Sequence, residues 1–152
     1  EVEGLPTVLE WSGPLYDWTS RIAVHTGLPT VIGWDWHQTQ QRGDFAHLVQ
    51  ERKQAVQSFY TVADQARMSE ILDAYDVGLV VVGTQEHRFG DAFALSAIDG
   101  HPALTAVFRD GDNVIYRVDP TALRQPIRER FTTAAPVATS STSASSTTQE
   151  PS

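Results

Sequence analysis

The segment after residue 33 carries the side chains best suited to chemistry in this chain. Trp34-Asp-Trp-His-Gln38 places two indoles, an imidazole, a carboxylate and an amide directly after a short apolar run. Large aromatic side chains in a loop are costly to leave in water unless something binds or covers them. Indole rings can cover the C–H face of a sugar while planar polar groups bond its hydroxyls, so this mixture favours a polyhydroxylated ligand.

A second polar group, Gln85-Glu-His-Arg88, follows another apolar run. Ligands of open α/β sheets bind beyond the carboxyl ends of parallel strands, so we expect the two groups to converge at one edge. The candidate ligand-binding residues are Trp34, Asp35, Trp36, His37, Gln38, Arg42, Glu86, His87 and Arg88, with Arg21 bracing the first loop. The alternative is that the two tryptophans pack against the next helix and that Arg21 forms a surface ion pair with Asp17.

The sequence offers little support for catalysis or for a metal. Asp35, His37, Glu86 and His87 are chemically suitable metal ligands, but no HxH or HExxH spacing is present. No glycine-rich nucleotide loop, nucleophile elbow or convincing triad occurs, and the chain has no cysteine. We therefore predict no catalytic residue, no metal and no cofactor.

The elements that must position these residues alternate between strand and helix patterns. Three short β-branched runs predict strands at residues 7–11, 30–34 and 78–83, the last as a central strand buried on both faces. Apolar spacing predicts a helix over residues 45–59 after an Asp44 N-cap, and another whose N-cap is Asp64 and whose apolar face includes Met68 and Tyr75. Two further runs, residues 104–109 and 113–118, flank an Asp-Gly-Asp turn typical of a hairpin. We predict an α/β fold, a three-layer sandwich with a mixed, mainly parallel sheet closed by a C-terminal β-hairpin.

Composition limits the domain organisation and the partners. The 152 residues, 41% of them hydrophobic, predict one domain at 1–131, followed by a disordered Ser/Thr/Ala/Pro-rich tail at 132–152. A formal net charge of −8 argues against nucleic acid as a partner. No apolar run is long enough to span a bilayer.

Several blocks of the chain resemble a known family. They are Trp18-Thr-Ser-Arg21; Thr26-Gly-Leu-Pro-Thr-Val-Ile-Gly-Trp34 with His37 and Gln41-Arg-Gly43; Tyr60-Thr-Val-Ala-Asp64, Ile71-Leu-Asp-Ala-Tyr75 and Val80-Val-Val-Gly83 with Glu86 and Arg88; and Val114-Ile-Tyr-Arg-Val118. Together they resemble the soluble C-terminal domain of the YYY family, multi-spanning membrane proteins akin to C-type membrane glycosyltransferases. The chain differs from the family pattern at Asp35-Trp36, where the family usually has Pro-Gly.

The resemblance implies an extracytoplasmic domain cut from a longer membrane protein, as the start at Glu1 also suggests. It would be non-catalytic by itself and would assist in binding glycan or acceptor. Its partners would be the membrane-embedded portion of the same polypeptide and a glycan or lipid-linked sugar. Two alternatives remain: a stand-alone acid/base enzyme using Asp35, His37 and Glu86, and a purely structural domain that docks on its own membrane helices.

Overall fold

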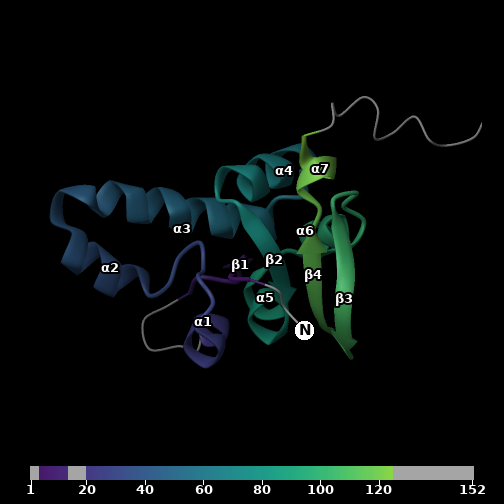
Figure 1. Cartoon of the computed structure of the whole chain (residues 1–152), viewed down its shortest axis with the longest axis horizontal. Coiled ribbons are helices and arrows are strands. Elements are labelled where there is room, and N and C mark those ends of the chain that lie inside the picture. Colours follow the sequence, from purple (N-terminus) through teal and green to yellow (C-terminus); the bar gives the residue numbers. More distant parts are fainter. Residues whose placement is uncertain (1–3, 14–19, 125–152) are drawn as a thin grey trace, which may run out of the picture.

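A four-stranded sheet organises the described part of the chain, in the order β1-β2-β4-β3. The computed structural model describes residues 4–13 and 20–124 (Figure 1). Its strands are β1 (Thr7–Leu9), β2 (Val77–Val82), β3 (Leu104–Asp110) and β4 (Asn113–Val118). The predicted tail, the domain end at residue 131 and Asp17 lie outside the described residues.

The strand directions confirm an α/β fold with a mixed sheet. β1 runs parallel to β2, whereas β4 is antiparallel to both β2 and β3. The prediction of a mainly parallel sheet is therefore wrong, because two of the three pairings among the described strands are antiparallel. The sheet is also open, with β1 and β3 at its two edges. We predicted a closed sheet, and that prediction is wrong.

The predicted strand at residues 30–34 does not form. Thr30 makes only an isolated parallel bridge to Val8, and the backbone hydrogen bonds there join Val8 N–H to the Pro29 carbonyl and Val31 N–H to the Val8 carbonyl. Proline lacks an N–H and glycine weakens a strand, so Pro29 and Gly33 leave too short a stretch for a ladder. Val31 and its neighbour Ile32 are buried all the same, which explains the strand-like sequence.

Helices supply the rest of the fold. They are α1 (Arg21–Thr26), α2 (Asp35–Arg42), α3 (Ala46–Thr61), α4 (Gln65–Ala74), α5 (Thr84–Phe89), α6 (Ala92–Asp99) and α7 (Pro120–Leu123), with a 3-10 turn η1 (Gly43–Phe45). The Asp64 cap of α4 is confirmed, since its carboxylate accepts the N–H groups of Ala66 and Arg67. The Asp44 cap is wrong, because Asp44 lies inside η1 and Phe45 is the N-cap of α3.

The two faces of the sheet are covered unequally. Apolar residues of α3, α4 and α6 pack against one face, where Val80 and Tyr116 are buried beneath Phe59 and Leu72. On the other face, a smaller cluster of Val8, Leu79 and Val81 packs with Ile22, Leu28 and Ile115. The short helix α1 and the segment after it supply this second cover (Figure 1). These contacts do not confirm the predicted third layer of the sandwich.

Candidate functional site

The carboxyl ends of the parallel strands β1 and β2 meet at a buried carboxylate. Glu86 is 0% exposed, and its Oε1 accepts the backbone N–H of Trp11 at 2.8 Å. Its Oε2 accepts the Gly83 N–H at 2.9 Å and pairs with Arg21 Nη2 at 2.7 Å. Because Gly83 is the N-cap of α5 and Glu86 is three residues further on, the local bond is half of a capping box. Glu86 therefore ties α1 to the ends of both strands.

A second buried carboxylate, Glu10, sits one residue after β1. Its oxygens accept the N–H groups of Ile22 at 3.1 Å and Ala23 at 3.4 Å. Glu10 therefore caps the first turn of α1, although the bonded residues are 12 and 13 positions away in the sequence. Burial raises the pKa of Glu10, while the two backbone donors and the charge of Arg21 oppose the rise. The charge of Glu86 adds to it. The two carboxylates and Arg21 thus form one electrostatically connected group.

Tyr60 of α3 bonds the same two strands near their carboxyl ends. Its hydroxyl lies 2.9 Å from the Leu9 carbonyl and 2.8 Å from the Val81 carbonyl and donates its proton to them. Complete burial raises the pKa of Tyr60 well above its usual value, with the charge of Glu86 contributing. The phenol therefore stays protonated and acts as a donor that fixes β1 beside β2.

The aromatic segment 34–38 forms the first turn of α2 rather than a loop. Trp34 and Trp36 are 49% and 51% exposed, and the Trp34 ring lies 5.6 Å from the His37 ring. The carboxylate of Asp35 pairs with Lys53 Nζ of α3 at 2.5 Å, which fixes the turn on the longer helix. Gln38, in the same turn, is partly buried. Both indoles therefore keep about half of their surface open to solvent on a supported helix.

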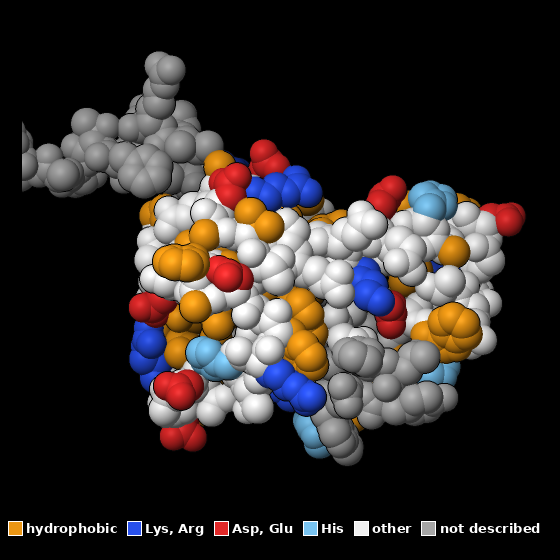
Figure 2. Space-filling view, turned by 180° about the vertical axis from the view of Figure 1, so that it is seen from behind, with side chains coloured by type: hydrophobic (Ala, Val, Ile, Leu, Met, Phe, Trp, Pro, Cys, Tyr) orange, Lys and Arg blue, Asp and Glu red, His pale blue; other side chains and the backbone are white. Residues whose placement is uncertain are grey.

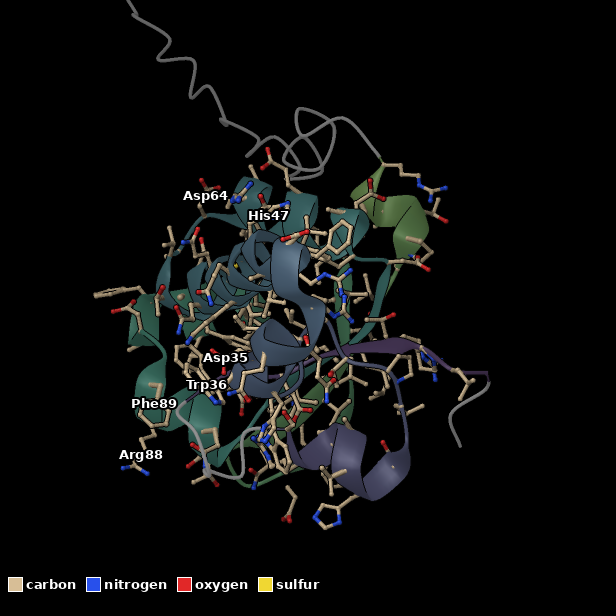
Figure 3. The ribbon with its side chains drawn as sticks, turned by 90° about the vertical axis from the view of Figure 1, so that its left-hand side faces the viewer. Asp35, Trp36, His47, Asp64, Arg88 and Phe89 are labelled. Carbon is tan, nitrogen blue, oxygen red and sulfur yellow. The ribbon has the colours of Figure 1, made fainter. Side chains whose placement is uncertain are left out.

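The other candidate residues are spread over the molecule. His87 is exposed, with its Nε2 2.9 Å from the Asp112 carbonyl. The guanidinium of Arg88 lies 4.9 Å from the Phe89 ring centroid and extends away from the body of the molecule in Figure 3. Arg42 ends α2 and is exposed. Arg21 pairs with Glu86 and thus braces the strand ends.

The expected convergence of the two polar groups does not appear in these contacts. Among the described residues, no hydrogen bond, ion pair or ring contact given by the structure joins segment 34–38 to Glu86, His87 or Arg88. The reason is the missing strand at 30–34, whose end would have placed the first group beside the second. No three potential metal ligands gather within residues 4–13 and 20–124.

One Ser–His pair resembles a catalytic dyad without being able to act as one. Ser69 Oγ lies 3.1 Å from His101 Nε2, and both side chains are buried. The Ala103 N–H donates to His101 Nδ1, so in a neutral ring Nε2 carries the proton. An Nε2 that already bears a proton cannot accept one from Ser69. The pair holds α4 to the segment before β3.

Sequence reasoning missed the roles of Glu10 and Trp11. Both lie at the end of the apolar run that forms β1, and an acidic residue in such a run is a signal, because a carboxylate is seldom buried without partners. Those partners, the N–H groups of Ile22 and Ala23, are 12 and 13 residues away in sequence. The signal marks the residue but not what it binds.

Comparisons with family models, curated proteins and solved structures found no match to this chain. The resemblance to the YYY family therefore remains a prediction. Within the described ranges, no helix combines the length and apolar character needed to cross a bilayer.

Proposed function

We propose that this chain is a non-catalytic α/β domain that assists glycan or acceptor binding in a membrane glycosyltransferase-like protein. The observation that carries the binding role is the half-exposure of Trp34 and Trp36 on a helical turn supported by α3. An exposed indole can stack on a sugar ring at low entropic cost, because a tryptophan side chain has only two torsions to order. The neighbouring His37 and Gln38 supply groups that bond hydroxyls.

The wider setting of this proposal rests on the sequence blocks that resemble the YYY family. On that basis we place the domain on the extracytoplasmic face of a membrane, next to the membrane-embedded portion of its own polypeptide. We keep the three-layer sandwich with its C-terminal hairpin as part of this proposal, with α1 as the thinner layer.

The acid/base enzyme alternative receives less support from the geometry. Glu86 has no exposed surface, and its two oxygens already serve three donors. Asp35 is paired with Lys53. A general acid or base must reach its substrate, and neither carboxylate is free to do so.

The structural-domain alternative has one observation in its favour. Val107 and Phe108 are exposed on β3, which lies at the end of the sheet, and apolar side chains there suit a docking partner. On the face shown in Figure 2, however, hydrophobic side chains form several small groups among polar ones. A docking surface is normally one contiguous apolar patch, so we rank this alternative second.

Calorimetric titration against neutral saccharides and polyprenyl-phosphate sugars tests the proposed function. We expect dissociation constants on the order of millimolar to high micromolar, since a few stacking and hydroxyl contacts barely exceed the cost of association. Trp36→Ala and His37→Ala should weaken binding. Phe93→Ala removes an aromatic ring from α6 that is even more exposed, 78% against 51% for Trp36, and should not weaken binding. Equal affinities for Trp36→Ala and the unaltered chain would overturn the proposal.

A further inference from the structure

An open groove lies where β3 and β4 meet the start of α7. It has a volume of about 400 Å³, and the residues that line it are Thr105, Val107, Arg117, Val118, Asp119 and Pro120. In the register of the sheet, Arg117 is opposite Thr105 on one side and Leu79 on the other, and Leu79 belongs to the smaller apolar cluster. Cross-strand partners point to the same face of a sheet. The groove therefore opens on the less covered face.

The strand beside the groove has an open backbone edge. β3 is at one end of the strand order and forms the outer rim of the sheet, so among the described strands it pairs only with β4 (Figure 1). All of its residues after Leu104 are exposed. Such an edge leaves backbone N–H and C=O groups ready to pair with another strand. Pairing of this kind is carried by the main chain, so it does not require a wide apolar patch.

The two halves of this edge are protected to different degrees. Proteins discourage pairing at an edge strand with charged side chains and with bulges. In β3 the bulge lies between Ala106 and Phe108, and the half beyond it carries the charges of Arg109 and Asp110. The half beside the groove, residues 104–107, carries no charge. The unprotected half of the edge is therefore the one next to a space that can hold a side chain.

The charge that is free to bind in the groove is positive. Arg117 is exposed, and within the described part of the chain its guanidinium has no ion-pair partner. Asp119 also lines the groove, but its carboxylate accepts the N–H groups of Thr121 and Ala122 as the N-cap of α7. A guanidinium can bind a carboxylate through two parallel hydrogen bonds. An acidic side chain therefore complements the groove better than a basic or an apolar one.

We propose that β3 and this groove form a docking site for an extended, acidic segment of a partner protein. The segment adds a strand along residues 104–107, and one of its carboxylates binds Arg117, which gives the interaction its specificity. A second copy of this chain fits less well, because pairing through the same four residues brings no carboxylate to Arg117. The site uses no residue of α2, so it goes beyond the proposed glycan binding and does not depend on it.

Titration of the whole chain with short peptides, followed by heteronuclear NMR, tests this site. The probe is the terminally blocked peptide Thr-Val-Glu-Val-Thr, with counterparts in which Gln or Lys replaces Glu. We expect saturable shifts of the Thr105 and Val107 amide signals, and about 2- to 5-fold tighter binding of the Glu peptide than of the Gln peptide, as for one exposed ion pair. The Lys peptide should bind most weakly.

Three variants of the chain sharpen the test. Arg117→Gln should remove the preference for the Glu peptide, whereas Arg42→Gln removes an exposed arginine from α2 and should keep it. Val107→Asp places a carboxylate in the lining and should weaken binding of the Glu peptide more than that of the Gln peptide. Trp36→Ala should leave peptide binding unchanged, because the glycan site is separate.

Several results would overturn the proposal. They are equal affinities for the Glu and Gln peptides, an equal loss of preference in Arg117→Gln and Arg42→Gln, and the absence of any saturable shift at Thr105 and Val107. Shifts of these signals with protein concentration alone would show that a second copy occupies the edge. Shifts on deletion of residues 125–152, without peptide, would show that the chain's own C-terminal segment occupies it.

Discussion

Two polar and aromatic segments of similar composition have opposite environments in this molecule. The segment around Glu86 is drawn into the interior, where its carboxylate serves three donors from separate parts of the chain. The segment around Trp36 stays at the surface, held by one ion pair through Asp35. The difference arises because only the first follows a strand that is paired on both sides. Residue type alone therefore did not decide which segment supports the fold and which remains open to a ligand.

We expect the largest effect on stability from a change at Val81, in the buried strand β2. Val81→Asp places an unpaired carboxylate in a central strand buried on both faces, at a cost of several kcal/mol, comparable with the whole stability of a domain. The variant should fail to fold, as judged by circular dichroism. Val107→Asp, on the exposed edge strand, is the matched control and should fold. A soluble Val81→Asp that unfolds cooperatively would contradict the sheet order.

Removing the Glu86 carboxylate should give the next largest effect. Glu86→Ala leaves Arg21 and two backbone N–H groups without their acceptor, and breaking a buried pair in this way costs about 3–5 kcal/mol. Urea unfolding measures the loss. Glu70→Ala removes a carboxylate from an exposed ion pair with Arg67 and should cost less than about 1 kcal/mol. Similar losses for the two variants would mean that Glu86 does not hold the strand ends together.

The pH dependence of stability should reveal the buried state of Glu10. Its pKa is raised on folding, so the folded chain keeps this proton at pH values where the unfolded chain has released it. The contribution of Glu10 to stability is therefore greatest below its ordinary pKa and falls as pH rises through the raised value. Glu10→Gln should remove this fall, which urea unfolding at a series of pH values would detect. A stability difference between the two proteins that does not change with pH would argue against a raised pKa.

Much of the fold follows from local patterns in the sequence. The helix capped by Asp64 and the buried strand β2 were predictable, because apolar spacing and capping chemistry act over a few residues. The missing strand at 30–34 was not, because its β-branched residues are buried without a ladder. Nor could the burial of Glu86 be predicted, because its partners Trp11 and Arg21 are 75 and 65 residues away. Long-range pairing decides such positions, and no local pattern records it.

Trp36→Ala gives the smallest expected effect on stability and tests glycan binding most directly. The thermal midpoint should change by less than about 2 °C, since a half-exposed side chain contributes little to the core. The decisive measurement follows the indole N–H signals of Trp34 and Trp36 by NMR during titration with neutral saccharides. We predict that both signals shift and saturate in the unaltered chain, and that the Trp34 shift is lost in Trp36→Ala. Unmoved signals, together with a midpoint lowered by more than about 4 °C in Trp36→Ala, would show instead that these tryptophans are packing residues.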